Sequence, residues 1–154
     1  MSVKGKRIIF AGPADGAESK PLHTEGKAIQ AIAPGSILKQ TAAGLDLNNI
    51  AAIIFGEPPL IADMNSMEQL TVDDAWTINE NMVAIRPRSG EFVNCLVADS
   101  VTLIKGDPVA RNSAGLLKLA VTPATVGATS EEIFGYSDEA VVTSGTTLVR
   151  IVFK

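Results

Sequence analysis

The sequence predicts an all-β fold, a compact β-barrel or sandwich built from two related β modules, and three observations predict it. The chain has 13 glycines and 8 prolines among 154 residues, with short apolar runs between them, which is typical of short strands joined by turns. Two stretches share one pattern of glycine, apolar and polar residues, Gly35–Leu47 and Gly106–Leu119. Aromatic residues make up only 5%, so Val, Ile, Leu and Ala must form most of the core.

Three landmarks recur in the same order in both halves of the chain, which indicates the duplication of one small β unit. Gly35 corresponds to Gly106, at a separation of 71 residues. The other two landmarks have separations of 79 and 66 residues: Ile54-Phe55-Gly56 with Ile133-Phe134-Gly135, and Val83-Ala84-Ile85 with Val149-Arg150-Ile151.

Residues 1–26 are expected to form an extended N-terminal arm. Two glycines and two prolines lie between Gly12 and Pro21, and this excludes a regular helix there. The alternative is that Arg7–Ala11 forms the first strand of the core, and the sequence leaves both open.

The first module is expected at residues 27–90. It has a loop inserted at residues 63–76, where Met64, Met67 and Leu70 have a loose helical spacing. Thr71 and Asp74 also have the spacing of a helical capping box. The strands expected around this loop are Ala28–Ala33, Ile37–Gln40, Leu45–Leu47, Ala51–Gly56 and Thr77–Ile85.

The second module is expected at residues 91–154. It has extra residues at Thr122–Ser130, where the first module has none. Insertions in repeated units usually form exposed loops, so this segment and Met64–Trp76 are candidate contact loops. The expected strands are Phe92–Val97, Val101–Ile104, Pro108–Arg111, Leu116–Val121, Ile133–Tyr136, Glu139–Val142 and Thr147–Phe153.

Charge and hydropathy argue against several classes of protein. The net charge of −4 gives no basic face for nucleic acid. The longest apolar run, Ile50–Gly56, is too short to span a membrane. We also find no signal peptide, so we expect a soluble protein made in a reducing compartment.

The sequence offers no catalytic, metal or cofactor site, so we expect a protein that is not an enzyme and works through surface contact. His23 is the only histidine and Cys95 the only cysteine, but one is expected in a loop and the other within a strand. The acidic pairs at 73–74, 131–132 and 138–139 do not have the spacing of a calcium loop. Trp76 is expected either as a buried anchor or as an interface residue.

The second module carries a pattern that resembles the small β-barrel modules of tailed-phage head decoration, or capsid cement, proteins. The pattern consists of Gly106–Ala110 (GDPVA), Ala114–Leu116 (AGL), Ile133–Ala140 (IFGYSDEA) and Ser144–Ile151 (SGTTLVRI). It covers residues 91–154 and, through the duplication, extends more weakly to residues 27–88. The first copy departs from it, because Ser36-Ile37 replaces Asp-Pro.

The resemblance implies a structural virion protein, made in the bacterial host cytoplasm and located on the outer capsid surface. It implies binding to the expanded phage capsid, where the protein clamps neighbouring subunits of the major capsid protein against internal DNA pressure. A homotrimer is implied, with a dimer left open, and no cofactor. The alternative is a carbohydrate- or host-surface-binding module of a phage fibre or baseplate, in which Trp76 and Tyr136 would be exposed.

Eight residues are candidate contacts with the capsid. Three are basic and would suit an acidic surface, three are apolar residues of the arm, and two belong to the inserted loop. They are Lys4, Lys6, Arg7, Ile8, Ile9, Phe10, Met67 and Trp76.

Overall fold

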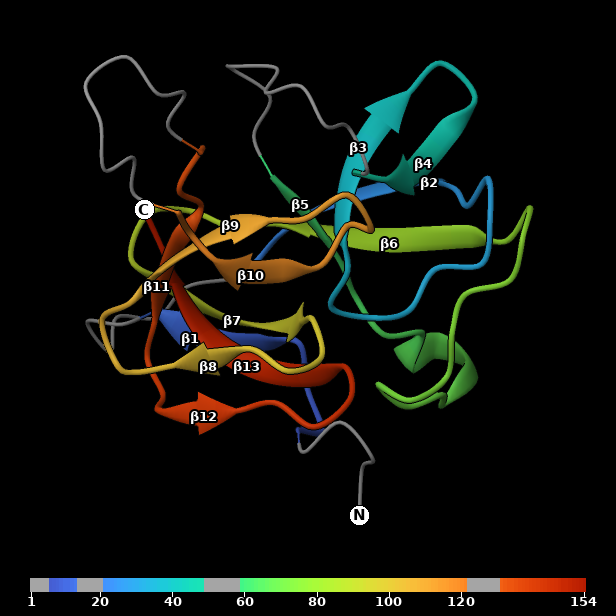
Figure 1. The fold of residues 1–154 in the computed structure, drawn as a ribbon. Helices are drawn as coiled ribbons and strands as arrows, with labels where there is room; N and C mark the ends of the chain where they lie inside the picture. Colours follow the sequence, from blue (N-terminus) through green and yellow to red (C-terminus); the bar gives the residue numbers. More distant parts are fainter. Residues whose placement is uncertain (1–5, 14–20, 49–58, 122–130) are drawn as a thin grey trace.

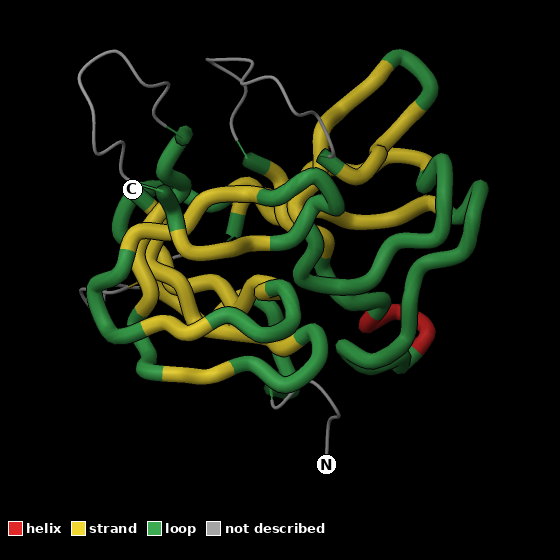
Figure 2. Tube along the Cα trace, in the orientation of Figure 1, coloured by secondary structure: helices red, strands yellow, loops and turns green. Residues whose placement is uncertain are grey.

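A computed structural model describes residues 6–13, 21–48, 59–121 and 131–154, and its all-β architecture confirms the predicted fold class. Two larger sheets lie side by side, the second of which combines strands of the C-terminal half with one N-terminal strand, and a two-stranded ribbon lies beside it (Figure 1). The one helical element in the described ranges is a single 3-10 turn at Ser66–Glu68 (Figure 2).

We call the first sheet, with its enclosed side chains, the first barrel. Its strands are β2 (Leu22–Lys27), β3 (Ile37–Thr41), β4 (Gly44–Leu47), β5 (Leu60–Ala62) and β6 (Asn81–Arg86). They are hydrogen-bonded in the order β2-β6-β5-β3-β4, and a single bridge between Ala28 and Leu45 brings the two end strands together.

The second barrel is a closed ring of five strands. They are β7 (Glu91–Val97), β9 (Pro108–Arg111), β10 (Leu117–Leu119), β11 (Gly135–Ser137) and β13 (Thr147–Phe153). The ring runs β7-β10-β9-β11-β13 and closes because β13 also pairs with β7. Strand β1 (Phe10–Pro13) adds to β7, and β8 (Thr102–Leu103) pairs with β12 (Val141–Val142).

The two barrels have the same strand order, which shows the duplication in space. Strands β2, β3, β4, β5 and β6 take the places of β7, β9, β10, β11 and β13. Backbone hydrogen bonds between the strands repeat as well. The matched bonds are Gly35 N to Ala62 O (2.8 Å) with Gly106 N to Ser137 O (2.7 Å), and Asp63 N to Val83 O (3.0 Å) with Asp138 N to Arg150 O (2.9 Å).

The predicted landmarks hold to different degrees. Gly35 and Gly106 occupy equivalent turns with φ of 87° and 94°, a backbone region that favours glycine. The third landmark is wrong by one residue. The equivalent residues Ala62 and Ser137 pair with Ala84 and Ile151, so Ala84 corresponds to Ile151 and not to Arg150. Ile54-Phe55-Gly56 lies outside the described residues, and β5 is the strand equivalent to β11.

Side chains of the first barrel alternate between two hydrophobic clusters, as expected for strands. One set fills its interior: Ala28, Ile32, Leu38, Leu45, Leu60, Ala62, Trp76, Met82 and Ala84. On the opposite face, Ile37, Ile61 and Ile85 form a row of direct cross-strand neighbours. All three are 0% exposed and belong to the cluster that contains the second barrel's core.

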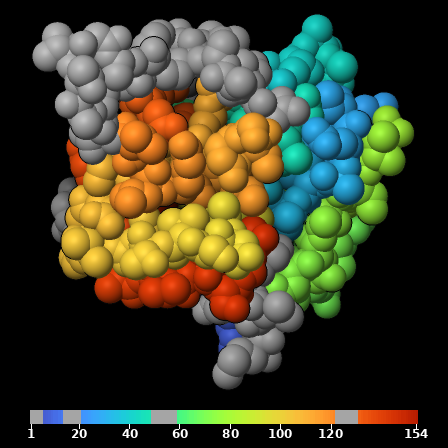
Figure 3. Space-filling model, viewed as in Figure 1, coloured from blue at the N-terminus to red at the C-terminus, as the bar shows by residue number. Residues whose placement is uncertain are grey.

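The outward row of isoleucines therefore joins the two barrels into one packed unit. Figure 3 shows the surfaces of the two barrels against each other. Leu96 and Leu148 are cross-strand partners in the second barrel. They approach the first barrel so closely that a Cβ added at Gly35 would lie 2.5 Å from Leu148 Cδ2. Leu96 N also donates to Gly35 O at 2.9 Å.

The N-terminal segment is expected from the sequence either as an extended arm or as a first strand of the core. Its described part contributes strands. Residues 10–13 pair with β7 and Ile9 is 1% exposed. The strand thus begins three residues later than Arg7. Residues 22–27 form β2, so the first barrel begins before the expected boundary at residue 27.

The inserted loop at residues 63–76 is not helical beyond its single 3-10 turn. Asp74 Oδ2 accepts hydrogen bonds from Thr71 N at 2.8 Å and from Thr71 Oγ1 at 2.7 Å. These contacts close a loop turn instead of capping a helix, so the helical expectation for this segment is wrong.

Candidate interaction surfaces

The structure divides the eight candidate contact residues between two places. Lys6, Arg7, Ile8, Ile9 and Phe10 lie along the second barrel, whereas Met67 and Trp76 lie in the loop of the first. Lys4 lies outside the described residues.

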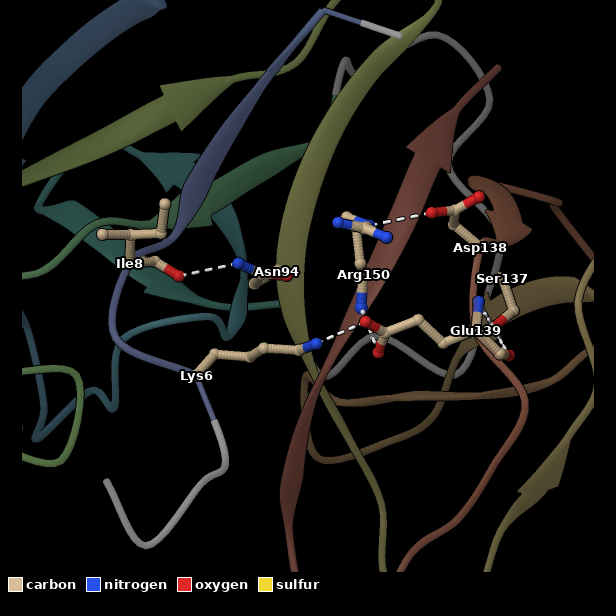
Figure 4. A network of polar contacts seen from close by, with 7 residues as sticks. All are labelled: Lys6, Ile8, Asn94, Ser137, Asp138, Glu139 and Arg150. Atoms are coloured by element: carbon tan, nitrogen blue, oxygen red, sulfur yellow. Dashed lines mark hydrogen bonds and ion pairs between the residues drawn. The ribbon is translucent and has the colours of Figure 1, made fainter. Parts of the chain in front are cut away.

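The N-terminal segment is anchored to the second barrel by polar contacts of Lys6, Ile8 and Ile9, and Figure 4 shows those of Lys6 and Ile8. Asn94 Nδ2 donates to Ile8 O at 2.9 Å, and Asn94 N donates to Ile9 O at 2.7 Å. Lys6 Nζ forms an ion pair with Glu139 Oε1. Ile9 itself is buried, so it is unavailable to a partner, which corrects its assignment as a contact residue; Arg7 and Ile8 remain exposed.

Asp138 lies between two cations on the outer face of the second barrel. Its Oδ1 is 3.0 Å from Lys105 Nζ and its Oδ2 is 2.8 Å from Arg150 Nε. The hydrogen bond from Lys105 has the largest effect on the pKa of Asp138 and lowers it below its ordinary value. Burial opposes this shift, and the hydrogen bond from Arg150 adds to it. The Arg150 guanidinium also lies over Phe92, 5.3 Å from the ring centroid, a cation–π geometry.

The inserted loop forms one side of a pocket on the outer face of the first barrel. The pocket has a volume of about 210 Å³. Strands β2 and β6 supply its floor and the loop supplies its wall. The lining residues are His23, Glu25, Asp63, Met64, Asn65, Ser66, Met67, Trp76, Asn81 and Val83.

Asp63 is the most buried charged group of this pocket. Burial raises the pKa of Asp63, and the Met64 amide and His23 oppose that shift in part. His23 Nε2 lies 3.6 Å from Asp63 Oδ2. Asp63 is the positional equivalent of Asp138, yet Val83 stands where Arg150 stands in the second barrel.

Trp76 takes the first of its two expected roles, that of a buried anchor, and is not an exposed contact residue. Its side chain is 3% exposed and belongs to the core of the first barrel, and its Nε1 donates to Asp63 O at 2.6 Å. Met67, by contrast, is 91% exposed. Tyr136 is 38% exposed, so only one of the two aromatic residues considered for a glycan platform reaches the surface.

The cysteine and the histidine do not form a nucleophile–base pair. Cys95 lies in the second barrel's core, where burial raises the pKa of its thiol, and a thiol with a raised pKa is a poor nucleophile. The described ranges contain no group of three or more His, Cys, Asp and Glu side chains that could hold a metal ion. They also contain no helix of the length and apolarity that a membrane span requires.

Sequence reasoning missed two kinds of feature. The pocket joins residues of β2 to residues forty positions later, and no short motif marks that contact. Ile104 and Val142 are 62% and 72% exposed, although the apolar runs that contain them predicted ordinary strands. Both lie at the β8–β12 ribbon and add exposed apolar surface to the second barrel.

Comparison with known proteins adds no relative. No protein-family model matches the chain, and no curated protein matches it.

The equivalent positions Asp63 and Asp138 predict opposite effects of the same substitution. Asp138→Asn should lower the free energy of unfolding at pH 8 by about 1 kcal/mol, because it removes ion pairs with Lys105 and Arg150. Asp63→Asn should raise it, because ionised Asp63 is disfavoured by burial. Chemical denaturation of the two variants measures both changes.

The pH dependence of these effects follows from the direction of each pKa shift. The stabilisation from Asp138 is present above the ordinary carboxyl pKa and is lost as the pH falls through its lowered pKa. The cost of ionised Asp63 is absent below the ordinary pKa and complete above its raised one. Effects of the same sign in both variants at pH 8 would contradict this assignment.

Proposed function

We propose that the chain is a structural virion protein that binds the outer surface of an expanded phage capsid and clamps neighbouring subunits of the major capsid protein. The observation that carries the proposal is the duplicated small barrel, whose second copy holds the residues that resemble capsid decoration proteins. Those residues lie on three strands of the closed ring, β9, β11 and β13, and on the turns between them.

The packing between the barrels supports a mechanical role. Ile37, Ile61 and Ile85 fix the first barrel against the second, so a load applied to one is transmitted to the other. A clamp needs such rigidity, because binding energy spent on deforming the clamp would not stabilise the shell.

Mass action supplies the stabilising effect. A protein that binds only the expanded lattice shifts the equilibrium toward that lattice by an amount set by its concentration and dissociation constant. Several weak contacts made by one oligomer add through effective concentration. The resemblance to capsid decoration proteins implies a homotrimer, which we propose here, and sedimentation equilibrium of the purified protein should give three times the chain mass of 16.1 kDa.

The proposal is tested with isolated phage heads. Purified protein should bind expanded capsids and not unexpanded procapsids, and it should raise the temperature at which filled heads rupture. Equal affinity for both shells, or an unchanged rupture temperature at saturating protein, would exclude the clamp.

A further inference from the structure

In the second barrel, strand β1 pairs with one edge of β7. The equivalent edge of β2 in the first barrel has no such strand in the described ranges. On β7, the edge that faces away from β13 is covered by β1 at residues 91–93 and by β10 at Val97. Within the described residues, the edge of β2 that faces away from β6 is paired with β4 at one bridge, between Ala28 and Leu45, and the Leu45 side chain also lies against Gly26. Across the described ranges no strand pairs with that edge at Leu22–Glu25.

Backbone amides establish which groups face the open edge. In the second barrel, Asn94 N donates to Ile9 O and Ala98 N donates to Leu117 O. Ile29 N, the equivalent of Ala98 N, donates to Leu45 O. Because successive amides of a strand point to opposite edges, Glu25 N points to the same edge as Ile29 N. At the equivalent edge of β7, Asn94 N donates to Ile9 O, the residue before β1.

The pocket beside this edge defines the side chains that would fit. Glu25 and Asp63 both line it. Their equivalents in the second barrel, Asn94 and Asp138, have different polar partners. The side chain of Asn94, at the position of Glu25, donates to Ile8 O next to β1, whereas the Glu25 carboxylate can only accept. Asp138, at the position of Asp63, has two cations, whereas Asp63 has the half-exposed His23. No Lys or Arg lines the pocket, and Met64, Met67 and Val83 offer apolar contact.

We propose that the Leu22–Glu25 edge of β2 binds an extended segment of a partner protein by antiparallel strand addition. The segment places a Lys or Arg against Glu25 and Asp63 and, two residues away on the same face of the added strand, an apolar side chain in the pocket. This inference rests on the duplication and on the charges of the pocket, and it does not depend on the identity of the capsid.

The chain itself supplies a probe of this chemistry. Residues 4–13 (KGKRIIFAGP) combine basic and apolar residues and include the strand that pairs with the equivalent edge of β7. A fluorescent peptide of this sequence should bind the full chain saturably, as measured by anisotropy. Binding should weaken with salt, since exposed ion pairs are screened.

Glu25→Pro is the decisive variant. It removes the outward amide while leaving the amides that face β6 in place, and proline is tolerated at an outward position of an edge strand. Peptide affinity should fall at least about tenfold, in line with the loss of a hydrogen bond beside a carbonyl left unpaired. Glu25→Ala, which keeps the amide and removes the charge, should weaken binding only about threefold.

Amide chemical shifts locate the bound peptide. The proposal expects the largest changes at His23–Glu25, and thermal denaturation should show that Glu25→Pro remains folded. Changes centred on Phe92–Asn94 would mean that the peptide displaces β1 from β7, and would overturn the proposal. Unchanged affinity in Glu25→Pro, absent binding, or self-association of the chain through this edge would also overturn it.

Discussion

Replacing Ile61 by alanine is expected to lower the free energy of unfolding by about 2–5 kcal/mol, the usual range for a buried isoleucine. Ile61 is the middle residue of the row that joins the barrels, and it is 0% exposed. The residue pairs with Ile37 on one side and Ile85 on the other, so a cavity there would reduce contact in both directions. Urea denaturation of the variant measures the loss.

Tyr136 is the matched control because it occupies in β11 of the second barrel the position that Ile61 occupies in β5 of the first. It pairs with Pro108 and Val152 as Ile61 pairs with its isoleucines, but its outer face is uncovered, and the side chain is 38% exposed. Tyr136→Ala should therefore cost less than about 1 kcal/mol. Similar losses in both variants would mean that the isoleucine row does not hold the barrels together.

The second large effect is expected at the first strand. Ile9→Ala should lower the free energy of unfolding by about 2–5 kcal/mol, and removal of residues 1–13 should lower it further. Ile9 is 1% exposed and belongs to the hydrophobic cluster that contains the second barrel's core. The carbonyl oxygens of Ile8 and Ile9 each accept a hydrogen bond from Asn94. Differential scanning calorimetry of the three proteins gives the order of stability.

Ile8 provides the control within the same segment. It has the same side chain and is 48% exposed, so Ile8→Ala should change the free energy of unfolding by no more than about 0.5–1 kcal/mol. If residues 1–13 can be deleted without loss of stability, the segment is a free arm in solution and the anchoring by Asn94 and Lys6 is wrong.

Turns were more predictable from the sequence than strand registers. Gly35 and Gly106 are needed for positive φ at equivalent turns, so a local backbone requirement marks the repeat. Strands β5 and β11 share no such local requirement, because their residues are Leu-Ile-Ala and Gly-Tyr-Ser. The true equivalents Ile61 and Tyr136 have no chemical similarity, and the Phe-Gly resemblance indicated a different separation.

The candidate site was predicted only in part, for a related physical reason. The exposed loop that carries Met67 could be expected from its position as an insertion. The burial of Ile9 and Trp76 could not, because each depends on contacts with residues distant in sequence: Asn94 for the segment at Ile9, and Asp63 and Ile32 for Trp76. Whether a strand edge is open depends on which strands are its neighbours, and composition does not specify that.

Cryo-electron microscopy of phage heads prepared with and without the protein tests the proposed function most directly. The account predicts density for two joined barrels on the outer surface of expanded heads, absent from heads that lack the protein. Density for the protein in the tail, fibre or baseplate, or no difference between the two preparations, would contradict a role in clamping the capsid.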